Sequence, residues 1–307
     1  MELLYFLEKI RVPGLNEFML LITQLGEETA FLVIALVVFW CVDKRKGYFL
    51  MAVGFAGTIL NQFLKLLFRV PRPWILDPNF TILEQAREAA AGYSFPSGHT
   101  QMAVGTFGSL AATTKKRSVA VICITLAVLV SFSRMYIGVH TPADVLTSVA
   151  IAVGLILLLK PMSDRWGLKQ MKAAIAAMLL MAMGLLLFVE YYPLGNVDAH
   201  NLESGMKNAY TMQGCLIGVA VVYLAERKYV NFETKAVWWA QILKAVLGLG
   251  LVLLVKESLR APLEAVMPHY TARSARYFLI VVTAGFLWPM SFRWFSRLGG
   301  KHELRNH

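Results

Sequence analysis

Long apolar runs dominate this sequence and set the strongest limit on its fold. A helix needs roughly 20 apolar residues to cross the hydrocarbon core of a bilayer. Only 16% of the residues are charged, against about 25% in a typical soluble domain. Because backbone amides in hydrocarbon must be paired within their own segment, we expect an all-α bundle. Nine runs approach or reach spanning length: residues 27–42, 48–68, 99–114, 118–133, 143–160, 172–192, 209–225, 237–256 and 276–293.

We predict a single polytopic helical domain with about nine transmembrane helices, because the sequence contains no repeat or low-complexity linker. Residues 1–26 form an N-terminal region. Its apolar residues recur at helical spacing among charged ones, which favours a helix lying in the membrane interface, and residues 13–25 suit a re-entrant or interfacial helix. Residues 27–192 hold a six-helix core, and residues 193–307 add three further helices and a cytoplasmic tail.

The basic residues indicate an orientation. The net charge is +11, but the lysines and arginines lie in short clusters between apolar runs, a pattern typical of membrane topology rather than of nucleic-acid binding. With nine spans all the clusters fall on one face, which we expect to be cytoplasmic. The outer or lumenal face then holds residues 69–98 and 134–142. The clusters are Lys44–Lys46, Lys115–Arg117, Arg165–Lys172, Arg227–Lys235 and Arg293–Arg305.

Three polar segments share the outer face, and the first is KLLFRVPRP at residues 65–73. Proline disfavours helix at the residue before it, so Pro71 and Pro73 predict that the second helix ends near Arg69. Lys65 then sits in the last turn of that helix. Arg72 projects from the extended segment that follows.

The second segment, YSFPSGHTQ, begins the third helix. Ser97 is placed to cap this helix, and Gly98 leaves its first backbone N–H groups approachable. Such N–H groups form a ready anion site at a helix start. His99 stands at the mouth of that site.

The third segment, SRMYIGVHTPAD, joins the fourth run to the fifth. Thr141 and Asp144 have the spacing of a capping box, and Pro142 occupies the favoured first helical position. His140 precedes Asp144 by four residues, so the carboxylate can fold back onto one imidazole nitrogen. That contact would fix the tautomer and leave the other nitrogen free to act as a nucleophile.

Lys65, Arg72 and Arg134 put three fixed positive charges on this face. Together they suit a phosphoryl group, whose transfer requires stabilisation of negative charge. The same cations would repel a metal ion, so we expect metal-free chemistry without a cofactor. Each residue alone is commonplace, as an interfacial anchor or a packed histidine. Their combination on one face is what indicates a site.

The segments resemble a known signature. K-x6-R-P at Lys65–Pro73, P-S-G-H at Pro96–His99 and S-R-x5-H-x3-D at Ser133–Asp144 are similar to the three motifs of the type 2 phosphatidic acid phosphatase superfamily. The span layout is similar to its sphingosine-1-phosphate phosphatase and glucose-6-phosphatase branches. The resemblance implies a phosphomonoester or diphosphate hydrolase with a phosphohistidine intermediate. It implies that His140 is the nucleophile, Asp144 its orienting partner and His99 the acid. Phosphoryl oxygens would be bound by Lys65, Arg72, Ser97, Gly98 and Arg134.

We therefore expect a lipid phosphatase acting at the outer or lumenal face on phosphatidate, a sphingoid phosphate or an isoprenyl phosphate or diphosphate. We expect no nucleic acid and no obligatory protein partner. A phosphatase for a soluble sugar phosphate is the first alternative, and a polar cavity floor would favour it. A transporter or scaffold on the same fold is the second, and loss of His99, His140 or Asp144 would favour that.

Two further features carry expectations. Residues 74–95 mix apolar and charged residues, which suggests an amphipathic flap over the site, with an ordinary interfacial loop as the alternative. Lys244 lies inside the eighth run, close enough to its basic end for the side chain to snorkel towards the cytoplasmic side.

Overall fold

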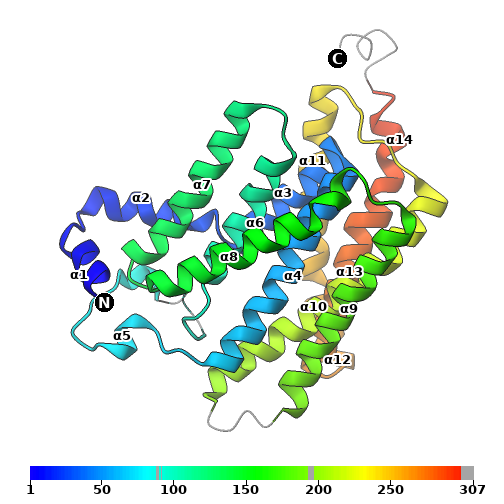
Figure 1. Ribbon diagram of the computed structural model, residues 1–307. Helices are drawn as coiled ribbons and strands as arrows, with labels where there is room; N and C mark the ends of the chain where they lie inside the picture. Colours follow the sequence, from blue (N-terminus) through cyan, green and yellow to red (C-terminus); the bar gives the residue numbers. More distant parts are fainter. Residues whose placement is uncertain (88–89, 91, 193–196, 299–307) are drawn as a thin grey trace.

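The computed structural model describes residues 1–87, 90, 92–192 and 197–298. A helix coincides with every predicted apolar run, and no strand occurs among these residues. The fold is thus the expected all-α bundle (Figure 1). The helices that match the runs are α3 (Glu28–Val37, continued by a π-helical turn, Val38–Val42), α4 (Lys44–Phe68), α6 (Gly98–Thr113), α7 (Arg117–Tyr136), α8 (Pro142–Leu159), α9 (Leu168–Tyr191), α10 (Ala199–Ala225), α11 (Trp238–Ser258) and α13 (His269–Val282).

The number of complete spans differs from the prediction of nine. Within the described ranges, seven helices are long and apolar enough to cross a membrane. An eighth span results if α2 (Pro13–Gln24) and α3 are counted together, although they are bent by 52°. That bend agrees with a re-entrant segment before the first run. The remaining helix, α6, has 16 residues and packs against α4, α7 and α8, so neighbouring helices surround much of it.

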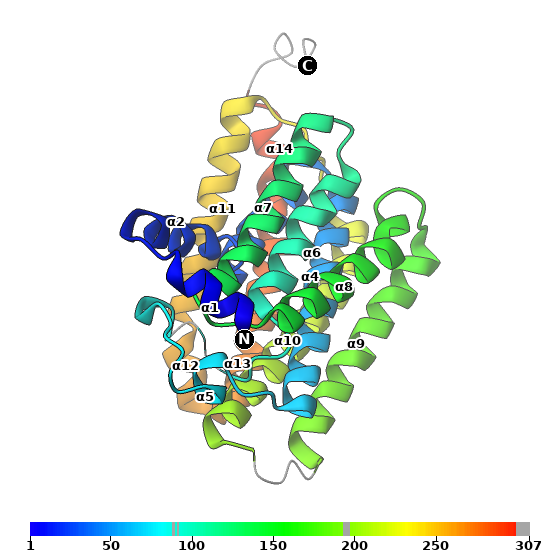
Figure 2. The same ribbon diagram turned by 60° about the vertical axis from the view of Figure 1, so that its left-hand side comes forward.

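The helices form two groups that meet at α4. Helices α6, α7 and α8 pack on one another on one side, and α10 packs on α9 and α13 on the other. Helix α4 contacts α6 and α8 from the first group and α9 and α10 from the second (Figures 1 and 2). Helix α2 lies crosswise against α7, outside both groups. The ends of α4 and α7 and the starts of α6 and α8 therefore converge.

The first helix, α1 (Glu2–Lys9), was expected in the membrane interface. Its Leu4 and Leu7 are buried, and Leu4 packs with Phe80 and Ile82 from the loop after α4. Its other apolar side chains remain mostly exposed. The protein thus buries only Leu4 and Leu7 of this helix, and its place in the membrane interface stays a prediction.

The basic loops gather at one end of the bundle. Lys46 Nζ donates to the Thr113 carbonyl at 3.0 Å, beside the second cluster. Arg45 Nη1 donates to the Asp164 carbonyl at 3.2 Å, beside the third. Lys44 Nζ pairs with Glu226 at 2.9 Å, beside the fourth. Figure 1 places α14 (Phe292–Phe295) at this end too. The predicted basic tail residues Lys301 and Arg305 lie outside the described residues.

Lys244 does not reach water as expected. Its side chain is only 1% exposed. Its ammonium group donates to the Thr234 carbonyl at 3.0 Å and lies 4.6 Å from the centre of the Phe292 ring. The side chain points towards the basic end, as predicted, but a protein carbonyl and an aromatic face replace solvent.

Helices α10 and α13 approach each other closely through small residues. A Cβ atom on Gly214 would lie 2.1 Å from the Ser274 carbonyl oxygen. A Cβ atom on Gly218 would lie 2.8 Å from Cβ of Val281. Small residues four apart allow two helix backbones to pack this closely in a membrane. The contact holds α13 close against α10.

Replacing Gly214 by alanine should therefore destabilise the protein, because the backbone of α13 must move to admit the methyl group. We expect a loss of about 1–3 kcal/mol, the usual cost of overpacking, visible as a lower thermal unfolding midpoint in detergent. Gly184→Ala is the matched control, since a Cβ atom there meets nothing within 4 Å. Equal midpoints for the two variants would contradict the close contact.

Candidate active site

A cavity of about 320 Å³ lies where the ends of α4 and α7 meet the start of α6. Six of the eight residues predicted from the motifs line it, and the other two, Ser97 and Asp144, lie behind that lining. The three segments are thus brought together as expected. The six lining residues are Lys65, Arg72, Gly98, His99, Arg134 and His140.

The end of α4 follows the proline pattern. The helix stops at Phe68, and Arg69 adopts a left-handed conformation with φ of 53°. Lys65 remains in the last turn, where it is buried and donates to the Tyr93 carbonyl. The ammonium group is therefore held at the site by a backbone oxygen.

Arg72 extends from the segment after α4 and is buried. Its Nε donates to the Gly92 carbonyl and its Nη1 to the Val139 carbonyl, both at 2.9 Å. Nη1 also lies 2.9 Å from Nε2 of His140. Two carbonyls from different loops thus fix the plane of the guanidinium group beside the imidazole.

Ser97 caps α6 as predicted, since its hydroxyl accepts a hydrogen bond from the Thr100 amide at 3.4 Å. Its own amide donates to the Asp144 carbonyl at 3.2 Å. This second bond, which the sequence did not indicate, ties the start of α6 to the first turn of α8. Gly98 and His99 consequently face the cavity.

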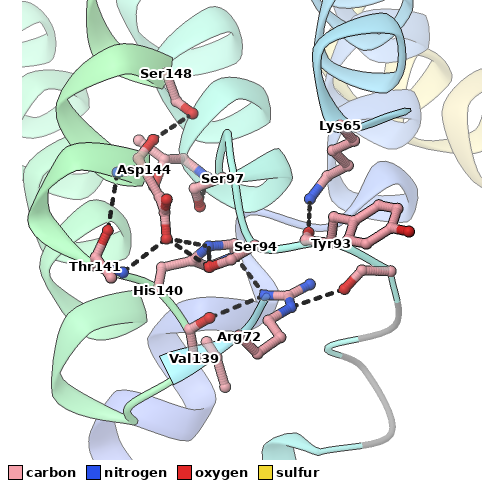
Figure 3. A network of polar contacts seen from close by, with 12 residues as sticks. Lys65, Arg72, Tyr93, Ser94, Ser97, Val139, His140, Thr141, Asp144 and Ser148 are labelled. Atoms are coloured by element: carbon pink, nitrogen blue, oxygen red, sulfur yellow. Dashed lines mark hydrogen bonds and ion pairs between the residues drawn. The ribbon is translucent and has the colours of Figure 1, made fainter. Parts of the chain in front are cut away.

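The capping box of α8 is also present (Figure 3). The Asp144 amide donates to the Thr141 hydroxyl at 3.3 Å, and the Thr141 amide donates to Oδ2 of Asp144 at 2.8 Å. The same carboxylate oxygen lies 3.4 Å from Nδ1 of His140 and accepts from the Ser94 hydroxyl at 2.5 Å. The predicted return of the carboxylate onto His140 is therefore confirmed.

The partners of the two ring nitrogens of His140 determine which nitrogen carries the proton. Arginine can only donate hydrogen bonds, so Nε2, which faces Arg72, is an acceptor and Nδ1 carries the proton towards Asp144. Burial, followed by the neighbouring cations, of which Arg72 acts most strongly, lowers the pKa of His140 well below its usual range. The imidazole is neutral at neutral pH, with the lone pair of Nε2 on the cavity side.

Arg134 is held by an element that the motifs do not include. It is buried, and its Nη1 donates to the Thr23 hydroxyl at 2.6 Å, near the end of α2. The turn after α2 also packs closely against the site, because a Cβ atom on Gly26 would lie 2.9 Å from the His99 carbonyl oxygen. The bend between α2 and α3 therefore supports the cavity.

Sequence reasoning missed several polar side chains. Asn61 and Gln101 line the cavity and are 3% and 4% exposed. In the part of the chain that the structure describes, no partner satisfies the oxygen or nitrogen atoms of either amide. Asn61 precedes Lys65 by four residues, so helical spacing could have found it. Ser94 has no such signal, because an irregular loop brings it to Asp144.

The described residues of 74–95, the predicted flap, form that loop. Its described residues include two short helical turns, α5 (Pro73–Leu76) and Glu84–Ala86. The Leu83 amide donates to the Ile137 carbonyl at 3.1 Å. The end of the loop supplies the Tyr93 carbonyl and the Ser94 hydroxyl to the site. Glu88, part of the proposed flap, lies outside the described residues.

Comparison with known families agrees with this geometry. A profile described as PAP2 superfamily matches residues 45–168, which contain all three motifs. A second, described as PAP2 superfamily phosphatase, transmembrane extension, matches residues 210–301. The two matches separate the helices that bear the site from the last helices of the chain.

Sequence identity to individual relatives is 30% or 29% over the aligned residues. Phosphatidylglycerophosphatase B from Bacillus subtilis is 30% identical over 171 residues, which are 51% of this chain and 79% of the relative. Human sphingosine-1-phosphate phosphatase 2 is 29% identical over 143 residues, 45% of this chain and 35% of the relative. A crystal structure of a transmembrane PAP2-type phosphatidylglycerolphosphate phosphatase from Bacillus subtilis has 28% identity and a TM-score of 0.45, covering 54% of this chain and 85% of the other.

Undecaprenyl-diphosphatase BcrC from Bacillus subtilis is 30% identical over 141 residues, 45% of this chain and 70% of the relative. Two relatives thus share 30% identity over 70% and 79% of their own lengths. Together with the motif-bearing match at residues 45–168, this similarity makes the chain a member of the PAP2 superfamily of membrane phosphatases.

Proposed function

We propose that this protein hydrolyses the phosphate group of a membrane lipid through a phosphohistidine on His140, with no metal ion and no obligatory protein partner. One observation carries the proposal. The Nδ1 atom of His140 is backed by buried Asp144, while Nε2 faces a cavity that Lys65, Arg72 and Arg134 line. That is the arrangement of an oriented nucleophile beside a site for an anionic group.

The chemistry follows from these positions. A bound phosphoryl group takes the Arg72 N–H that now faces Nε2, which leaves the lone pair of Nε2 available to attack phosphorus. The bond from phosphorus to the leaving oxygen breaks, and His99 gives that oxygen a proton. Asp144 stabilises the positive charge on the ring of His140. Water then attacks the phosphohistidine, with His99 taking its proton, and inorganic phosphate leaves.

The relatives point to lipid substrates. By their names they act on undecaprenyl diphosphate, on phosphatidylglycerophosphate and on sphingosine 1-phosphate. The three lipids differ in structure, but each carries a terminal phosphoryl group at one end and one or more hydrocarbon chains at the other. We extend that shared chemistry to this protein, whose cavity lies at helix ends, where a headgroup can reach it while the chain stays in the bilayer.

A soluble sugar phosphate is the second candidate, and one observation favours it. Thr58, Asn61 and Gln101 give the cavity a polar floor beneath the cations. Unpartnered amides can bind sugar hydroxyls as well as phosphoryl oxygens. The choice between the candidates therefore depends on measured rates.

Purified enzyme should hydrolyse phosphatidate, a sphingoid phosphate or an isoprenyl diphosphate with a higher kcat/KM than glucose phosphate. Activity should persist in excess EDTA, because fixed cations supply the charge that a metal ion would otherwise provide. Vanadate should inhibit by mimicking the transferring phosphoryl group. A preference for glucose phosphate would support the second candidate. Activity abolished by EDTA and restored by Mg²⁺ would exclude the metal-free mechanism.

The residue roles predict distinct losses. His140→Ala removes the covalent route and should leave no phosphoenzyme and essentially no turnover. Asp144→Asn keeps the shape but removes the charge, and by analogy with serine-protease triads it should lower kcat by up to about 10⁴-fold. Phosphate trapped on acid-quenched enzyme and steady-state rates measure both effects.

The acid can be tested in the same assay. His99→Ala should cost less activity on nitrophenyl phosphate than on an alkyl phosphate, since nitrophenolate leaves without a proton. If label persists in His140→Ala and vanishes in His99→Ala, the nucleophile and the acid have been exchanged.

We place the site on the outer or lumenal face, because the basic loops lie at the opposite end of the bundle. In a background with Cys41, Cys123 and Cys215 replaced by alanine, Asn79→Cys should react with an impermeant maleimide in intact cells. Lys115→Cys should react only after permeabilisation. Both positions are exposed. The reverse labelling pattern would move the substrate to the cytoplasmic leaflet.

A further inference from the structure

We propose that an apolar groove between α3 and the last helices binds the hydrocarbon chain of the lipid substrate. This inference rests on the proposed lipid phosphatase function and gives the helices after residue 199 a role in it. The groove, called here the extension groove, has a volume of about 280 Å³ and is lined by α3, α4, α6, α10, α11 and α13. Its wall includes Val33, Leu36, Cys215, Val252, Leu253 and Ile280.

Helical spacing makes this wall continuous. On α11 the lining residues lie on one face of the helix, because they are three or four positions apart or adjacent. They are Leu249, Val252, Leu253 and Lys256. On α13, Tyr277, Ile280 and Val281 repeat the same spacing. The lining side chains of both helices are only partly buried, and Leu253 remains 53% exposed. The groove is therefore open to a hydrocarbon chain from the bilayer.

The groove and the catalytic cavity adjoin each other. Glu28, Thr58 and Met102 line both of them. On the cavity side of these residues lie His140 and the cations, and on the other side the lining is mostly apolar. A ligand that spans this boundary needs an anionic head and a hydrocarbon tail. A lipid phosphate has both parts in that order.

Moving a chain from the bilayer into the groove changes its surroundings little, because lipid tails are as apolar as the leucine side chains that replace them. The groove therefore orients the bound substrate and does not increase its affinity through the hydrophobic effect. A chain fixed along α11 holds the phosphoester in line with Nε2 of His140, and misplacement by about 1 Å can cost on the order of 100-fold in rate. Substrates without a long chain gain nothing from it.

Two neighbouring residues on α11 provide the test. Leu253 lines the groove, whereas Leu254 does not and is 64% exposed. Leu253→Trp fills the groove, and Leu254→Trp adds the same bulk to the lipid-facing surface. The substrates are matched pairs, dioleoyl with dihexanoyl phosphatidate and undecaprenyl with farnesyl diphosphate. The readout is the ratio of kcat/KM for the long member to that for the short member.

For the pair that the wild-type enzyme hydrolyses, Leu253→Trp should lower this ratio about tenfold or more, while Leu254→Trp leaves it as in the wild type. Equal ratios in both variants would overturn the inference and leave the proposed function intact. If the wild-type enzyme hydrolyses neither pair nor the sphingoid phosphate, the proposed function itself fails.

A binding measurement covers the case in which Leu253→Trp does not fold. His140→Ala enzyme is irradiated with phosphatidate that carries a photoreactive group on its chain, and labelled peptides are identified. Labelling within residues 249–256 that excess dioleoyl phosphatidate suppresses is the expected result. Labelling spread over lipid-facing surfaces and unaffected by the competitor would overturn the inference.

Discussion

Asp144 ties together three of the segments that build the site. Its Oδ2 accepts hydrogen bonds from the Ser94 hydroxyl and the Thr141 amide and lies beside His140, while its backbone carbonyl accepts from the Ser97 amide. One residue thus sets the loop after α4, the start of α6 and the start of α8 relative to one another. Charge-assisted bonds of this kind are stronger than neutral ones, and a buried carboxylate is costly unless they are made.

The membrane explains why this junction lies at helix ends. Within hydrocarbon the backbone must satisfy its own hydrogen bonds, so free amides and carbonyls are available only where helices start or stop. The structure uses those groups to hold cations, with the Tyr93, Gly92 and Val139 carbonyls binding Lys65 and Arg72. Burying like charges together opposes folding unless counter-charge is near. In the proposed function an anionic phosphoryl group supplies this counter-charge, so its binding offsets the repulsion among the buried cations.

Much of this arrangement could be predicted because it is local in sequence. The cap at Ser97, the capping box at Thr141 and the return of Asp144 onto His140 each involve residues three or four apart, and the proline before Arg72 fixes the end of α4. The Ser94 hydroxyl and the Thr23 hydroxyl could not be predicted, since they reach the site from 50 and 111 residues away. Lys244 was misjudged for a related reason: an apolar run does not show which carbonyl another loop will present.

The chain is divided into a part that bears the site and a part that follows it. Residues 45–168 match the superfamily profile and contain every residue assigned to phosphoryl transfer, whereas residues 210–301 match a separate extension. Phosphoryl chemistry is alike for lipids with different chains, so a core that performs it does not have to change with the substrate. In the proposed function the hydrocarbon chain is bound elsewhere, by apolar surface in contact with both the bilayer and the core. The close packing of α13 on α10 joins the helices of the extension. The bond from Trp40 Nε1 to the Ala284 carbonyl at 2.8 Å ties the extension to the turn that continues α3. Under the proposal for the extension groove, these contacts let a bound hydrocarbon chain set the position of the phosphorus atom relative to His140.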